Sequence, residues 1–305
     1  MSLRKIVVLC ILIVSLSIPV LTSNKYWLFV FSVCFMYVIL SLGMNIVTGW
    51  AGQFSLGSAA FFGIGAYAAA LLVMKIGFPF WLALILASLL GFLGGLILGY
   101  PCLRLRHMYL AMVTIAFTMI INEVLINWVD VTGGPLGLVG IPRPRIGFIS
   151  LATESSYYYF VFFVTLGVAW IMYKLRDCYI GRALNAIRQD DEVAEASGIN
   201  TTYYKVLSFS LSGLFSALAG GLYAFGLGFL SPETFNIGFS FLVLYMLLVG
   251  GIGTIEGAII GGFIVGILPE ALRFVSEYKL IVFSAVIIVI LIYSPRGIAK
   301  VFEKH

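Results

Sequence analysis

The chain contains 305 residues, of which 62% are apolar and 10% are charged, and its formal net charge is +5. A water-soluble domain carries roughly 25% charged residues, so this composition excludes a soluble globular protein and indicates that the bilayer is the solvent. At about 20 apolar residues for each membrane-spanning helix, the chain has room for about ten helices and no large soluble domain. We therefore expect residues 1–305 to form one transmembrane domain that is not itself an enzyme.

The apolar runs predict an all-α fold, a polytopic membrane helix bundle with about 8 to 10 spanning segments. The two glycine-dense stretches at 54–74 and 239–272 are expected to hold broken or re-entrant helices. The first run is expected to be a retained helix rather than a cleaved signal peptide, because no clear small-x-small cleavage site follows it. The predicted segments are 6–22, 27–47, 54–74, 79–100, 107–127, 157–173, 206–230, 239–250, 257–272 and 280–293.

The distribution of lysine and arginine predicts the orientation. With both termini inside, the internal loops hold about twice as many basic residues as the external ones, as the positive-inside rule requires. Two loops are long enough to dock a partner: an external loop at about 128–156 and an internal loop at about 174–205. The basic residues otherwise occur singly or in pairs between apolar runs, which argues against binding to nucleic acid.

The residues that usually hold metals or form disulfides are scattered. Cys10, Cys34, Cys102 and Cys178 show no paired ligand spacing, so we expect no disulfide and no metal site. His107 also lacks spaced partners for zinc or acid–base chemistry. We expect no cofactor.

The internal loop holds the densest charge in the chain. Residues from Gly181 to Ala196 are helix-compatible with a partly apolar face, and Gly198 suits a left-handed helix stop. A helix lying on lipid headgroups should be predominantly basic, whereas this segment mixes both signs of charge. We therefore interpret it as a protein-docking element rather than a headgroup-bound loop.

Glycines and polar groups point to two further features. Gly91, Gly95 and Gly99 lie four apart and predict close helix packing. Two glycine-interrupted segments, 49–65 and 250–262, occupy similar places in the two halves of the chain and are typical of broken helices beside a translocation path. The polar residues that could line this path or hydrogen-bond between helices are Asn45, Gln53, Ser55, Thr114, Thr254 and Glu256.

Several blocks carry a resemblance to a known family. Residues 181–200 (GRALNAIRQDDEVAEASGIN) look like the cytoplasmic loop of bacterial branched-chain amino-acid ABC transporter permeases. The other matching blocks, in the family's order, are 48–67 (TGWAGQFSLGSAAFFGIGAY), 103–117 (LRLRHMYLAMVTIAF), 132–138 (TGGPLGL), 248–257 (LVGGIGTIEG) and 294–297 (SPRG). The 103–106 segment and the Ala-Ile-Arg run favour the LivM-like over the LivH-like member of the permease pair.

The resemblance implies a subunit of the bacterial inner membrane that imports branched-chain or related apolar amino acids by ATP-driven alternating access. Its implied partners are a second, LivH-like permease, two cytosolic ABC ATPase subunits and an extracytoplasmic substrate-binding protein. The internal loop would be the ATPase-coupling helix, although Ser197 departs from the family's Glu-Ala-Ala pattern. The implied coupling residues are Arg182, Ile187, Arg188, Asp190, Glu192, Glu195 and Gly198.

Two alternatives stay open. The same blocks resemble urea and short-amide ABC permeases, and no residue separates those substrates from leucine or valine. A stand-alone secondary transporter or channel would need no ATPase, but the mixed-charge internal loop and the absence of an intramembrane proton relay argue against it.

Overall fold

The computed structural model describes residues 24–102, 108–146, 149–151 and 153–272, together with 19, 281, 284–285, 287–288, 292 and 297–301. The predicted segments 6–22 and 280–293 and the 103–106 block lie outside these residues, apart from isolated positions. The described helices are α2 (Lys25–Met44), the π-helix η1 (Asn45–Trp50), α3 (Ser58–Met74), α4 (Phe80–Cys102), α5 (Met108–Asn127), α6 (Val129–Thr132), η2 (Gly134–Leu136), α7 (Glu154–Asp177), α8 (Tyr179–Gln189), α9 (Asp191–Ala196), α10 (Thr201–Leu227), η3 (Pro232–Phe235), α11 (Ile237–Gly250), α12 (Ile255–Ala271) and α14 (Ile298–Val301).

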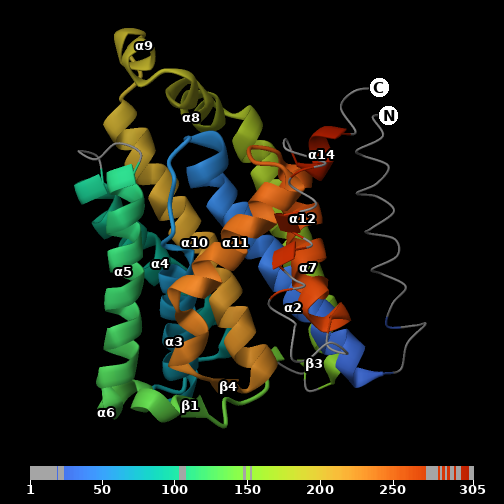
Figure 1. Cartoon of the computed structure of the whole chain (residues 1–305). Coiled ribbons are helices and arrows are strands. Elements are labelled where there is room, and N and C mark those ends of the chain that lie inside the picture. The colour runs from blue at the N-terminus through green and yellow to red at the C-terminus, as the bar shows by residue number, and fades with distance from the viewer. Residues whose placement is uncertain are drawn as a thin grey trace.

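The predicted all-α membrane bundle is confirmed. Five of the described helices are long and apolar enough to cross a membrane: α2 continued through η1, α4, α5, α7 and α10. Strands are limited to short pairs in the described residues. β1 (Leu138–Val139) pairs antiparallel with β4 (Phe229–Leu230), and β2 (Arg145–Ile146) with β3 (Ile149–Ser150). The strands lie at one end of the bundle, and α8 and α9 cap the other (Figure 1).

Helix α10 packs against α4, α3 and α2, and α2 also contacts α7 and α12. The predicted glycine packing holds for the pair α4 and α10. A Cβ on Gly95 would overlap the Phe209 carbonyl, and one on Gly91 would overlap the Gly213 carbonyl. The two helices therefore approach to backbone contact, which replaces side-chain packing as their source of van der Waals stabilisation.

The first glycine-rich stretch forms a broken helix, as expected. Helix α2 continues through η1 to the end of the bundle that carries α8, and residues 51–57 then run back into the bundle without helical structure before α3 begins at Ser58 (Figure 1). The extended segment reverses at Gly52, whose φ of 68° is readily accessible only to glycine. Helix α3 therefore spans only part of the bundle.

A second break lies outside the predicted glycine-dense stretch 239–272 and repeats the design in the opposite direction. The predicted stretch itself forms α11 and α12, which are separated by a turn at residues 251–254. Helix α10 runs toward the strand end, and residues 228–236 lead back into the bundle before α11 starts at Ile237. Asn236 caps α11 by accepting from the backbone N–H of Phe239. The beginnings of α3 and α11 meet inside the bundle, where the N–H of Ala59 donates to the Ser240 hydroxyl over 3.1 Å.

Helix α5 supplies hydrogen-bond partners for backbone groups that the two breaks leave without a helical partner. The Thr114 hydroxyl accepts from the N–H of Leu56 at 2.9 Å, and the Thr118 hydroxyl donates to the Leu56 carbonyl at 2.9 Å. The Asn122 amide donates to the carbonyl of Pro232 in the second break. Non-helical backbone at membrane depth needs such partners, because lipid supplies none.

Candidate functional site

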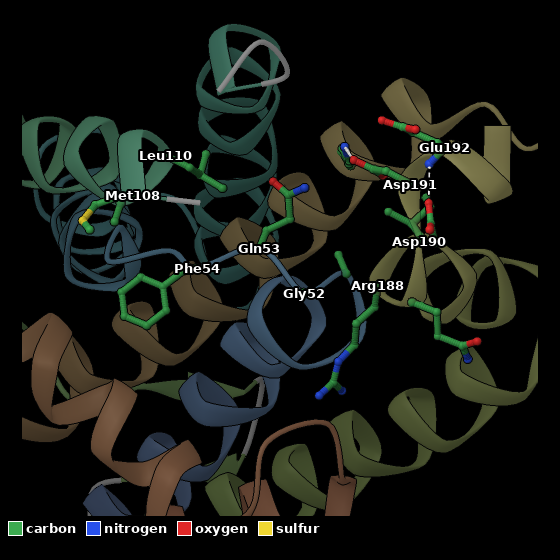
Figure 2. A pocket seen from close by; sticks show the side chains of 14 residues that line it. Gly52, Gln53, Phe54, Met108, Leu110, Arg188, Asp190, Asp191 and Glu192 are labelled. Carbon is green, nitrogen blue, oxygen red and sulfur yellow. Dashed lines mark hydrogen bonds and ion pairs between the residues drawn. The ribbon is translucent and has the colours of Figure 1, made fainter. Parts of the chain in front are cut away.

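A cavity of about 700 Å³ opens at the α8–α9 end of the bundle (Figure 2). Its walls come from the extended residues 51–54, the first residues of α5, the run 187–192 and Lys205 of α10. Gln53 and Phe54 project from the extended segment beside Met108, and Asp190 and Glu192 lie on the opposite side. The cavity thus joins the internal loop to the first broken helix.

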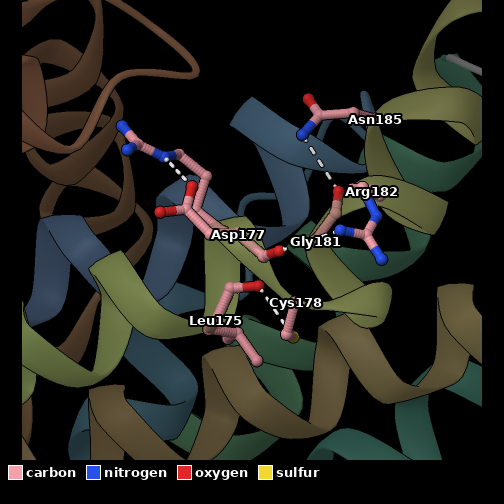
Figure 3. A network of polar contacts seen from close by, with 7 residues as sticks. Leu175, Asp177, Cys178, Gly181, Arg182 and Asn185 are labelled. Atoms are coloured by element: carbon pink, nitrogen blue, oxygen red, sulfur yellow. Dashed lines mark hydrogen bonds and ion pairs between the residues drawn. The ribbon is translucent and has the colours of Figure 1, made fainter.

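Helix α8 is fixed to the end of α7 by a compact polar corner (Figure 3). The Cys178 thiol donates to the Leu175 carbonyl, and Arg182 Nη1 donates to the Asp177 carbonyl. A Cβ on Gly181 would overlap the carbonyls that end α7. Only a glycine fits there, so the corner holds α8 at a fixed angle to the bundle.

The sequence predicted one helix from Gly181 to Ala196. This prediction is wrong, because the structure has two helices in its place. The chain is extended at Asp190 (φ −160°, ψ 118°), whose side chain accepts from the N–H groups of Glu192 and Val193 and caps α9. An aspartate N-cap followed by acidic residues in the first turn is a strong helix start. Gly198 ends α9 with a φ of 83°, which confirms the predicted left-handed stop.

Helices α8 and α9 each have one face buried against the bundle and one face exposed. Leu184 and Ile187 are 0% and 4% exposed and pack into the bundle, together with Ala194 of α9. Ile187 therefore belongs to the buried face. The expected coupling residues with exposed side chains are Arg182, Arg188, Asp190, Glu192 and Glu195.

Arg188 reaches inward despite its exposure. Its Nη1 donates to the carbonyl of Gly49 in η1 at 2.5 Å. In Figure 2 the side chain leaves α8 on the side away from Asp190 and Glu192. Arg188 thus ties the internal loop to the end of the first broken helix.

Asn45 joins η1, which ends the first broken helix, to the turn between α11 and α12 at the same end of the bundle. Its Oδ1 accepts from the N–H of Gly253 at 2.9 Å, and its Nδ2 donates to the carbonyl of Thr254 at 3.1 Å. The Thr254 hydroxyl accepts from the N–H of Gly257 and so caps α12. The two glycine-rich stretches of the sequence therefore meet in space.

The other expected path residues are spread along the first break and α12. Gln53 lines the cavity, whereas the Ser55 hydroxyl accepts from the N–H of Gly57 and Thr114 holds Leu56. Glu256 is buried in the first turn of α12. The structure therefore places Thr114 in a packing hydrogen bond, one of the two roles considered for it. In the described residues no three His, Cys, Asp or Glu side chains gather to hold a metal ion.

Sequence reasoning missed Thr118, which has no distinctive local pattern. Gly49 and Gly253 fall in the predicted segments 49–65 and 250–262, but their partner Arg188 lies far away in the chain and could not be predicted. The break at Asp190 did carry a signal, since Asp followed by Asp191 and Glu192 is a typical helix start.

Comparisons with known proteins agree on one family. A family model described as "Branched-chain amino acid transport system / permease component" matches residues 26–291. The chain is 30% identical to the high-affinity branched-chain amino acid transport system permease protein LivM of Salmonella typhimurium and of Escherichia coli K12, over 97% of this chain and 75% of each relative. It is 28% identical to LivH of Salmonella typhimurium, over 86% of this chain and 90% of the relative. No solved structure matches it.

Proposed function

The chain belongs to the branched-chain amino acid transport system permease family, and from this premise we propose that it is the permease subunit of a binding-protein-dependent ABC importer. The substrate is a branched-chain or related apolar amino acid. A second, LivH-like permease completes the path, two cytosolic ATPase subunits drive it, and an extracytoplasmic binding protein delivers the substrate. The chain is a multi-pass membrane protein and carries out no covalent chemistry of its own.

The α8–α9 element carries this proposal. Leu184, Ile187 and Ala194 of its apolar face are buried against the bundle, so little apolar surface is left to insert into lipid. Its exposed side chains include Arg182 of α8 and Glu192, Val193 and Glu195 of α9, and Val193 is 62% exposed. A surface that carries charges of both signs and an exposed apolar side chain suits a protein partner better than an anionic membrane.

The sequence also indicates that energy comes from a partner. A nucleotide-binding phosphate loop requires Gly-x-x-x-x-Gly-Lys-Ser/Thr, and the printed sequence contains no Gly-Lys pair. The proposed ATPases would bind the outer surface of α8 and α9 through Arg182, Asp190, Glu192 and Glu195. The bias of lysine and arginine supports a cytosolic position for this end and for both termini.

In the proposed mechanism, ATP binding and hydrolysis in the partners move α8 and α9, and the bundle alternates between outward and inward access. The broken helices line the path, with Asn45, Thr254 and Glu256 near the cytosolic junction and Gln53, Ser55 and Thr114 along the first break. An apolar amino acid needs only a weak site there. Substrate selection would rest mainly with the binding protein, which would engage the external loop at 128–156.

The proposal is tested by isolating the tagged chain from its native membrane in mild detergent and identifying bound proteins by mass spectrometry. We expect an ATPase with a phosphate loop and a second permease. Glu195→Arg, which reverses a charge on the outer surface of α9, should lose the ATPase and keep the second permease.

The matched control is Asp130→Arg, because Asp130 is an exposed acid in α6 at the opposite end of the bundle. It should keep both partners. Reproducible recovery of the chain alone, under conditions that preserve known ABC complexes, would point to a stand-alone transporter. Normal ATPase recovery with Glu195→Arg would remove α9 from the docking surface.

A further inference from the structure

Arg188 occupies the point where α8 meets η1 and the turn between α11 and α12. We propose that it is a positioning residue for transport: it transmits the displacement of α8 to the junction of η1 with that turn, rather than binding the ATPase. This inference rests on the proposed function, because it assumes that a partner moves α8.

The contacts of Arg188 reach both halves of the chain. Its Nη1 donates to the Gly49 carbonyl, which belongs to the π-helix that ends the first long helix. A Cβ on Gly253, in the turn between α11 and α12, would lie 2.5 Å from the same nitrogen. A Cβ on Gly52 would lie 3.0 Å from Arg188 Cγ. Two glycines, Gly52 and Gly253, therefore leave room for one arginine.

The junction that Arg188 contacts is itself tightly held. Asn45 receives the N–H of Gly253 and donates to the Thr254 carbonyl, so η1 and the α11–α12 turn are bonded together. A Cβ on Gly49 would overlap Asn45 Oδ1. A force applied at the Gly49 carbonyl is therefore shared by η1, beside the first break, and the α11–α12 turn rather than absorbed by one loop.

Apart from the polar corner with α7, the contacts of α8 with the bundle are less directional. Leu184 and Ile187 pack by apolar contact, which fixes distance better than orientation. The Arg188 hydrogen bond is charge-assisted and has a defined direction. It is thus suited to move the end of η1 when α8 moves.

The local charges agree with an inward role. Asp190, Asp191 and Glu192 line the same cavity as Arg188. Asp191 forms an ion pair with Lys205 of α10, whereas Arg188 Nη1 bonds a backbone carbonyl. Arg188 thus contacts its own permease, although the carboxylates of Asp190, Asp191 and Glu192 lie close by in sequence.

The decisive experiment uses the complete complex in proteoliposomes and measures ATP hydrolysed, amino acid transported and ATPase retained. Arg188→Met should keep the ATPase bound and ATP hydrolysis running, while substrate moved per ATP falls by about tenfold or more, within the range of typical coupling between sites. Arg188→Lys, which keeps the charge and a donor, should restore part of that ratio. A merely structural defect would lower hydrolysis and transport together.

The matched control is Arg176→Met, which removes a positive charge near the end of α7, where Arg176 pairs with Asp177. Its transport per ATP should equal that of the wild type. If Arg188→Met gives no intact complex, Arg188→Gln, a neutral donor of similar length, supplies the same comparison.

Two results would overturn the inference and leave the proposed function standing: unchanged transport per ATP in the Arg188 variants, or loss of the bound ATPase from them. Failure of the wild-type chain to bind any ATPase would instead refute the proposed function itself.

Discussion

The hydrogen bonds between α5 and the first break permit a sharp test. Leu56 lies in the extended segment and is 2% exposed, and its N–H donates to the hydroxyl of Thr114, which is 0% exposed. Thr114→Val keeps the shape of the side chain and removes the acceptor. The N–H of Leu56 then remains buried without its partner.

The expected decrease in the free energy of unfolding follows from this missing hydrogen bond. A buried donor without an acceptor destabilises a protein by about 1–3 kcal/mol, and hydrocarbon surroundings offer no water to replace it. The matched control is Thr165→Val in α7. The Thr165 hydroxyl donates to the Val161 carbonyl of its own helix at 2.8 Å and makes only a long contact of 3.4 Å with the Phe35 carbonyl of α2. Both carbonyls lie within regular helices, so we expect a change within about 0.5 kcal/mol.

The assay is equilibrium unfolding in mixed detergent micelles, which gives the free energy of unfolding for each variant. We expect Thr114→Val to fall below both the wild type and Thr165→Val. Equal stability of the two variants would show that the extended segment does not depend on α5 for its backbone hydrogen bonds.

Three further outcomes are expected. Gly95→Ala should sharply reduce the yield of monodisperse protein on size-exclusion chromatography, because its Cβ would overlap the α10 backbone. The control Gly94→Ala should keep the yield, because its Cβ would meet only side chains at 3.5 Å or more, and equal yields of the two variants would contradict the packing. Asp190→Ala removes the cap of α9, which is worth about 0.5–2 kcal/mol, so the amide of Val193 should exchange hydrogen faster; an unchanged rate would refute the cap. Asn45→Ala should lower thermal stability by breaking two hydrogen bonds to the α11–α12 turn, and an unaltered melting temperature would show that the junction is held by other contacts.

Much of the fold could be predicted because lipid leaves few choices. A segment in hydrocarbon must satisfy its own backbone, so the apolar runs locate helices such as α4, predicted at 79–100 and found at Phe80–Cys102. Glycine and polar residues within an apolar run marked the first break and the turn between α11 and α12, but not the break at 228–236. The four-residue glycine spacing predicted close packing along α4, although not that its partner is α10.

The contacts of the site could not be predicted in the same way. The bonds from Thr114 to Leu56 and from Asn45 to Gly253 join residues far apart in sequence, and one sequence gives no measure of which helices adjoin. Arg188 shows the same limit, since its place on a charged amphipathic helix suggests an outward contact while its guanidinium bonds Gly49. Only the three-dimensional placement of η1 reveals this direction.

The most direct test of the central claim is uptake of labelled leucine by proteoliposomes that contain the purified complex, with the binding protein outside and ATP either inside or absent. The account predicts accumulation only when ATP is enclosed, and its loss when a non-hydrolysable analogue replaces ATP. Equal accumulation without ATP would contradict an ATP-driven importer and identify the chain as part of a transporter that works without an ATPase.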